Sequence, residues 1–344
     1  MTKHKSKMQH LKKRFFINDH YKNGLLIGIL IIFVVGLILL TCSVYSFESN
    51  SFSVDVKLSI KRVIQMLFTG MSLGVASYLL QRMTNNRLAD TSIMGFGNFN
   101  LIPISILAIC TNFSNDSLIN NKLSIDQYNY VMPIVVVACS ILLCLIFNFL
   151  SKDKTKFNFK KLLLSGIILN FVAVAIAFSI SSAGDYLAIQ KIEQKAVGYI
   201  GGGLEDFNFY FDMAIILVAL LWIMINSYKI QLIIQNQQIA RQTGVYNISI
   251  MTQTMICIGL LVGGSYAMSG DFVFVGLIAG NIAFKYSKNK IYYGVPTSGL
   301  IGAFMVLITY FIFGNLINVP GNIIAPLIPL IISPYFIYLV IRWR

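Results

Sequence analysis

Residues 131–150 read VMPIVVVACSILLCLIFNFL, and residues 151–161, SKDKTKFNFKK, follow at once with five lysines. An uncharged apolar run of about 20 residues is long enough to cross the hydrocarbon core of a bilayer as a helix. The run is apolar on all sides and does not alternate with polar residues, which excludes a strand of a membrane β-barrel. This stretch therefore predicts a transmembrane helix that ends in a cationic loop.

The same pattern recurs along the chain, in which 56% of the residues are hydrophobic, 12% are charged and the mean hydropathy is +0.73. These values exclude an ordinary soluble domain. We predict an all-α membrane protein with about ten transmembrane helices, made of a basic tail (1–24) and a single polytopic domain (25–344). The predicted spans are 25–45, 63–81, 93–110, 131–150, 162–182, 209–228, 250–268, 272–284, 297–314 and 322–341.

The charges sort to opposite sides of these spans. If the chain changes side at each span, 21 of the 27 Lys and Arg residues share the side of the N-terminus, and 10 of the 13 Asp and Glu residues lie opposite. Because cationic loops resist translocation, the cationic side is predicted to be cytoplasmic, with both termini there. The net charge of +14 is dispersed over short loops, so we expect a multi-pass protein of the cytoplasmic (inner) membrane and no nucleic-acid partner.

The spans lack the side chains that would drive transport or catalysis. Their central thirds contain essentially no ionisable residue, whereas ion-coupled carriers normally keep such groups at the bilayer midplane. The chain also has no G-x-x-x-x-G-K-[ST] motif for ATP. We therefore expect a non-enzymatic chain without cofactor or metal, energised by another protein. An ion-coupled secondary transporter working without an ATPase is the alternative.

The span at 272–284 has only 13 residues, which is about 20 Å of helix and too short to cross alone. Either the bilayer thins there, or Ser269, Gly270 and Asp271 form a turn below the outer surface. The second arrangement would make Asp271 a partly buried carboxylate that faces the pathway. A loop-tip acid in water is the commoner arrangement and the one we expect.

A short amphipathic segment is predicted in the cytoplasmic loop at 229–246. Leu232, Ile233, Ile234 and Ile239 lie among polar residues, and Gly244 is placed to end a short helix. Such a helix fits a groove on a soluble partner. From periodicity alone, a helix lying on the membrane surface is equally compatible.

Several residue blocks resemble the permease subunits of type II ABC importers for iron-siderophore, haem and cobalamin, the FecCD or BtuC-like family. The resemblance is collinear from about residue 57 to the C-terminus. The family has a Leu-Leu-Gln, Asn-Pro-Leu-Ala-Asp-Pro and Leu-Gly series and a Gly-Phe-Val-Gly-Leu run. The first is matched by Leu79, Leu80, Gln81, Asn86, Leu88, Ala89, Asp90, Met94 and Gly95, and the second by Gly270, Phe274, Val275, Gly276 and Leu277.

The family also has a cytoplasmic coupling segment, Glu-x-Ala-x-x-x-Gly, which Gln238, Ala240, Arg241 and Gly244 match here. The resemblance implies a dimeric permease, homodimer or heterodimer, whose subunits each seat one cytoplasmic ABC ATPase at this segment. For the segment 229–246, the resemblance therefore favours a helix that docks on the ATPase over a helix that lies on the membrane surface. The block from Gln81 to Asp90 would form a cytoplasmic loop motif.

This chain departs from the family pattern at several positions. Both prolines of the Asn-Pro-Leu-Ala-Asp-Pro series are replaced, by Arg87 and Thr91, and the Pro-His that follows the Gly-Leu block is Gly280-Asn281. The acid of the coupling segment is Gln238. These changes indicate a divergent member and weaken any inference about its substrate.

Half of the six cations predicted outside gather just before the second span, at Lys57, Lys61 and Arg62. The resemblance implies docking of an extracytoplasmic substrate-binding protein there, steered by charge. Snorkelling to lipid phosphate is the alternative. We expect an iron chelate as cargo, ferric siderophore first and haem next. Small or polar residues proposed to border the pathway, for which simple core packing is equally compatible, are Gly70, Ser72, Gly74, Ser77 and Asp271.

Overall fold

The computed structural model describes residues 24–41, 52–111, 125–152, 157–181, 206–287, 290–317, 319 and 321–342, together with Ile189, Ile192 and Gly198. Almost all of the predicted basic tail lies outside these residues. The described elements are helices: Gly24–Thr41, α2 (Phe52–Thr84), α3 (Phe96–Cys110), α4 (Ile125–Ser151), α5 (Phe159–Ser181), α7 (Asp206–Gln235), α8 (Gln237–Gln242), α9 (Asn247–Ser269), α10 (Val275–Tyr286), α11 (Ile291–Tyr310) with the π-helical turn η1 (Phe311–Leu316), and α12 (Gly321–Arg342).

Each of the ten predicted spans coincides with one of these helices, which confirms the all-α class. Seven of the helices are long and apolar enough to cross a membrane. Helices α3 and α10 are shorter, with 15 and 12 residues, and α12 contains Pro326, Pro329 and Pro334. Ten crossings and two cytoplasmic termini therefore remain predictions.

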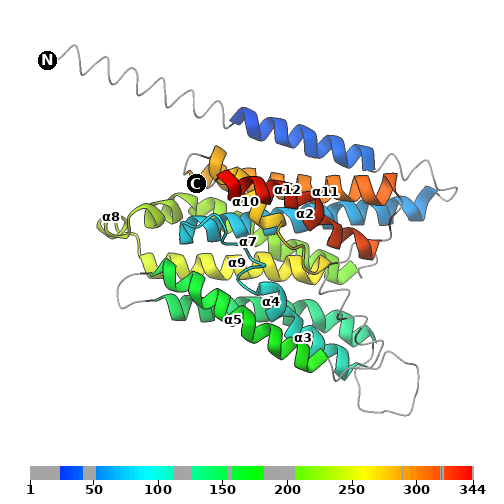
Figure 1. Ribbon diagram of the computed structural model, residues 1–344, viewed down its shortest axis with the longest axis horizontal. Coiled ribbons are helices and arrows are strands. Elements are labelled where there is room, and N and C mark those ends of the chain that lie inside the picture. Colours follow the sequence, from blue (N-terminus) through cyan, green and yellow to red (C-terminus); the bar gives the residue numbers. More distant parts are fainter. Residues whose placement is uncertain are drawn as a thin grey trace.

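Helix α2 forms the centre of the bundle. It packs against α11, α10 and α9, while α9 packs in turn against α4 and α7. Helices α3, α4 and α5 contact one another and form the lower edge of the bundle in Figure 1. The helix Gly24–Thr41 lies at the opposite edge and exposes most of its apolar side chains.

Glycines allow α2 and α11 to approach closely. A Cβ atom on Gly70 would lie 2.7 Å from the Ala303 Cα atom, and one on Gly302 would overlap the Gly70 carbonyl oxygen. Gly74 faces the Ser298 carbonyl in the same way. Because lipid tails are as apolar as leucine, close packing of this kind is a main source of helix association in a membrane.

Adding a methyl group at this contact should destabilise the fold. We expect Gly302→Ala to lower the free energy of unfolding by about 1–3 kcal/mol, because backbone atoms cannot move aside cheaply. Thermal unfolding in detergent measures this loss. Gly28→Ala is the control, since no atom lies within 4 Å of a Cβ placed there, and an equal loss in both variants would contradict the packing account.

Candidate functional site

The loop between α7 and α9 contains the short helix that the sequence predicts. The Asn236 side chain caps α8, because its Oδ1 atom accepts hydrogen bonds from the backbone N–H groups of Gln238 (2.9 Å) and Ile239 (3.3 Å). Gly244 follows the helix with a φ of +80°, a conformation that favours glycine. The expected helix and its glycine stop are confirmed.

Helix α8 presents one face to the protein and the other outward. The Ala240 side chain is fully buried, whereas Gln238 and Arg241 are exposed and Ile239 is 48% exposed. In Figure 1 the helix forms the end of the bundle, beyond the neighbouring helices. Three of the four matched coupling residues, Gln238, Arg241 and Gly244, therefore lie on an accessible surface.

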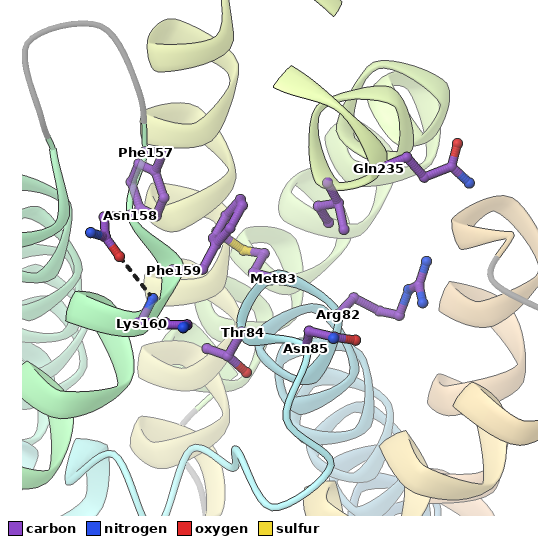
Figure 2. A pocket seen from close by; sticks show the side chains of 10 residues that line it. Arg82, Met83, Thr84, Asn85, Phe157, Asn158, Phe159, Lys160 and Gln235 are labelled. Carbon is purple, nitrogen blue, oxygen red and sulfur yellow. Dashed lines mark hydrogen bonds between the residues drawn. The ribbon is translucent and has the colours of Figure 1, made fainter. Parts of the chain in front are cut away.

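One cavity is lined in part by this helix, and a second lies at neighbouring helix ends. One, of about 740 Å³, is lined by Arg241, Gly244, Val245, Tyr246, Asn247, Ile248 and Ser249. The other, of about 590 Å³, lies where the ends of α2 and α7 meet the connection between α4 and α5. Figure 2 shows this second cavity, with Phe157 and Asn158 from the connection and Lys160 from the start of α5 on one side, and Arg82 and Gln235 from the helix ends on the other.

The α2–α3 connection folds back against the bundle, and its assignment as a cytoplasmic loop motif remains a prediction. Gln81, Ala89 and Asp90 are buried, and the Ser77 hydroxyl donates to Asp90 Oδ1 at 2.6 Å. Ser77 lies seven residues before the end of α2, which is about 10 Å along the helix. Gln81 Nε2 donates to the Leu277 carbonyl at 3.0 Å, and the Asn86 side chain accepts from the Leu88 N–H group.

Two departures from the family pattern touch each other at this connection. Asn281 Nδ2 donates to the Arg87 carbonyl at 2.8 Å. The guanidinium carbons of Arg87 and Arg82 lie 5.2 and 4.9 Å from the centroid of the Phe284 ring. Two cation–π contacts and one hydrogen bond thus attach α10 to the end of α2 and to the α2–α3 connection.

Asp271 is not a loop-tip acid in water, so that expectation is wrong. Gln65 of α2 donates to the Met268 carbonyl (2.8 Å), and the Thr69 and Ser269 hydroxyls lie 2.7 Å apart, which places the end of α9 beside the interior of α2. The Asp271 carboxylate lies against Gly97, in the first turn of α3. The positive end of a helix dipole favours a negative charge at such a position.

The four small or polar residues of α2 proposed for the pathway have packing partners within this chain. Ser72 and Ser77 are fully buried, and the Ser72 hydroxyl donates to the Thr69 carbonyl of its own helix. Gly70 and Gly74 contact α11. These packing contacts are enough to account for small or polar residues at the four positions. A role in the translocation pathway therefore stays a prediction.

Two of the outer cations, Lys61 and Arg62, are only partly accessible. Lys61 forms an ion pair with Asp206 at the start of α7, and its Nζ atom lies 5.9 Å from the centre of the Phe209 ring. Arg62 is half-buried, and the Lys57 side chain lies outside the described residues. Lys61 therefore links two helices, and docking of a binding protein at this cluster remains a prediction.

The sequence reasoning missed one residue at this site, Gln237. Its side-chain amide contacts both backbone polar groups of Phe157, in the α4–α5 connection. A glutamine within a polar run has no pattern that identifies such a contact, and the two residues are 80 positions apart.

The sequence profile of the FecCD transport family matches residues 24–342. The chain is similar to the iron-uptake system permease protein FeuC of Bacillus subtilis, with 24% identity, 83% of this chain and 83% of that protein. It is 21% identical to the vitamin B12 import system permease protein BtuC of Vibrio cholerae, covering 97% of each. The Fe(3+)-citrate import system permease protein YfmE of Bacillus subtilis is 25% identical, covering 81% of this chain and 79% of that protein.

Solved structures share the fold. An inward-facing structure of a metal-chelate type ABC transporter superposes with a TM-score of 0.76 and 17% identity, covering 92% of this chain and 99% of the other. PsaBC from Streptococcus pneumoniae, in complex with Fab, gives a TM-score of 0.53 and 11% identity, covering 82% of this chain and 89% of the other. The helical arrangement is thus shared with solved structures, one of which is a metal-chelate type ABC transporter.

The contact between Ser77 and Asp90 should stabilise the fold. Removing the donor with Ser77→Ala leaves a buried carboxylate oxygen with one hydrogen bond fewer, which should cost about 1–3 kcal/mol. Thermal or denaturant unfolding of the purified protein tests this. Ser333→Ala removes an exposed hydroxyl that bonds only to the Leu330 carbonyl of its own helix. A Ser77 variant as stable as this control would show that the contact contributes little.

Proposed function

This chain belongs to the FecCD transport family, and we propose that it forms the translocation pathway of an ABC importer for an iron chelate, with ferric siderophore ahead of haem. It is a multi-pass membrane permease. A lipid- or membrane-tethered binding protein delivers the chelate to the outer mouth of a permease dimer. Two cytoplasmic ATPase subunits drive the transport cycle by moving α8.

The observation that carries this proposal is the exposed position of α8 at the end of the bundle. The residues that match the family's coupling segment form a capped helix at the end of the bundle, and its Gln238, Ile239 and Arg241 side chains point away from the core. Ala240 belongs to the hydrophobic core, and α8 contacts both α7 and α9. A force applied to its exposed face therefore reaches two long helices.

The cargo is proposed from the relatives. Their names include iron-uptake, petrobactin, Fe(3+)-citrate and Fe(3+)-hydroxamate import, and also vitamin B12 import. Iron chelates predominate among these names, which supports iron ahead of cobalamin.

In the alternative, a secondary carrier, Asp271 would be the candidate coupling group. Although this acid lies inside the bundle, it is held at the N-terminal turn of α3 rather than paired with a cation or a histidine among the described residues. A proton- or ion-coupled carrier would need this group to change its charge or its ion during each cycle.

Vesicles that contain the permease, a candidate ATPase and a candidate binding protein test the proposal. We expect ATP-dependent uptake of labelled ferric siderophore, with haem and cobalamin as parallel arms. Uptake that persists without ATP and collapses with an uncoupler would establish the secondary carrier. Robust uptake by the purified chain alone would also contradict the proposal.

Charge reversal on α8 should uncouple hydrolysis from transport. We expect Arg241→Glu to lower uptake per ATP hydrolysed by about tenfold or more, which corresponds to roughly 1.4 kcal/mol of lost coupling. Gly244→Leu should act in the same direction, because leucine is strained at a φ of +80°. Lys285→Glu makes the same charge change at the end of α10 and serves as the control. Normal coupling in both α8 variants would show that the docking assignment is wrong.

A further inference from the structure

We propose that Asp271 and Asp90 form a buried proton site, in which Asp271 carries one proton for the pair. The site lies inside the bundle, where the turn between α9 and α10 meets the start of α3. The shared proton keeps the two acids from being charged together and makes this junction sensitive to pH. The site depends on neither the cargo nor the ATPase, so it goes beyond the proposed function.

The turn that carries Asp271 lies deep in the bundle. It follows Ser269, whose hydroxyl is 2.7 Å from that of Thr69, at the middle of α2. The next residue, Phe272, is 1% exposed. Asp271 itself is only partly exposed, and a Cβ atom on Gly97 would overlap one of its carboxylate oxygens. A carboxylate in such surroundings is poorly hydrated, which disfavours its charged form.

Asp90 places a second carboxylate at the same helix start. It is fully buried, and both of its oxygens accept hydrogen bonds. Oδ1 accepts from the Ser77 hydroxyl at 2.6 Å, and Oδ2 accepts from the Ser92 N–H group at 3.3 Å. The carboxylates of Asp90 and Asp271 lie within electrostatic range of each other. Because these donors favour the charged form of Asp90, a proton held by the pair belongs on Asp271.

The positive charge at this helix start is too small to balance two acids. The start of a helix is equivalent to roughly half an elementary charge, whereas two carboxylates carry two negative charges. Among the described residues, Asp271 forms no ion pair. Two neighbouring carboxyl groups avoid double ionisation when one of them keeps its proton. One bound proton therefore leaves a single negative charge beside the start of α3.

Neighbouring helices supply no compensating charge within the part of the chain that the structure describes. On α2, Lys61 is already in an ion pair, and Arg62 forms none with Asp271. Lys285 lies at the opposite end of α10. Helix α3 and the described side chains of α12 include no charged group. The missing positive charge must therefore be bound from solution.

A buried hydroxyl without a hydrogen-bond partner among the described residues lies beside the site. The Tyr266 side chain, in the last turn of α9, is 2% exposed. Its hydroxyl interacts electrostatically with Asp271. A protonated carboxyl group is a donor as well as an acceptor, so it can pair with a hydroxyl directly or through a water molecule. The Tyr266 hydroxyl thus provides a partner that a proton on Asp271 would complete.

A proton fits these ligands better than a metal ion does. A calcium ion takes six to eight oxygen ligands, and the described residues contain no group of three His, Cys, Asp or Glu side chains that could hold a metal. A proton needs only one carboxyl oxygen and one acceptor. We therefore assign the bound cation as a proton.

Infrared spectroscopy of the purified full-length chain tests the site, because a protonated carboxyl group has a C=O stretch that a carboxylate lacks. An ordinary aspartate is ionised at about pH 6. We expect a protonated-acid band at this pH that is lost in Asp271→Asn and kept in Asp206→Asn. Asp206 is the control, because it is an exposed acid in an ion pair. The absence of such a band, or a band lost only in Asp90→Asn, would overturn the proposal.

Substitution of the two neighbours tests whether the proton is shared. Asp90→Asn removes a negative charge and keeps an oxygen for the Ser77 hydroxyl. The band should therefore disappear at a pH about one unit or more below that of the wild type. Tyr266→Phe should change the frequency of the band without removing it. A band that behaves as in the wild type in both variants would contradict the shared site.

The same proton makes stability depend on pH. The unfolded chain releases it above about pH 4, so the free energy of unfolding falls as pH rises until Asp271 ionises in the folded chain, and then levels off. Between about pH 5 and pH 8, the melting temperature of the wild type should fall by about 2–4 °C relative to that of Asp271→Asn. Parallel profiles would contradict the proposal. Stabilisation by sodium chloride over choline chloride that is lost in Asp271→Asn would identify a metal ion instead and overturn it.

Discussion

Inside a bilayer, backbone polar groups that leave a helix find no water, so other parts of the protein must satisfy them. Helix α2 meets this requirement for its neighbours. Gln65 and Gln81 donate to the carbonyls of Met268 and Leu277, at the end of α9 and within α10. Ser77 donates to Asp90 in the α2–α3 connection. Short helices and irregular connections can lie in the bundle because α2 offers these donors.

The short helices follow from the same constraint. Helix α3 begins only at Phe96, because the connection before it runs inside the bundle beside α2. Helix α10 begins at Val275, after a turn whose backbone includes Gly270 at a φ of +82° and Phe274 at +66°. The carboxylate of that turn lies at the start of α3. Helix α3 thus starts where the connection before α10 supplies a carboxylate.

Apolar run length was sufficient to predict the helices that coincide with the ten spans, because burial in lipid selects the same residues that build the core. The positions of the connections could not be predicted in this way. Asn86 to Asp90 form a polar stretch that resembles a surface loop, and only the folded chain shows Ser77 beside Asp90. Asp271 was partly predictable, since a run of 13 apolar residues is too short to cross.

Contacts between residues far apart in the sequence explain the remaining differences between the sequence-based predictions and the structure. The outer cation cluster was visible in the sequence, but Asp206, the partner of Lys61, follows 145 residues later. No pattern in the sequence predicted the contacts of Gln237, because its partners are backbone atoms. Patterns along a chain report burial and charge, whereas pairings of this kind depend on which helix ends the fold brings together.

Departures from a family pattern are informative when they meet in space. Arg87 stands where the family has proline, and Asn281 stands where it has histidine, yet the two are hydrogen-bonded. Loss of the proline leaves the backbone at this position less constrained. The hydrogen bond from Asn281 and the stacking of Arg87 on Phe284 restrain it again from α10. The same connection can therefore be kept in place by contacts to a neighbouring helix instead of by local stiffness, which explains how the fold persists although the motif has changed.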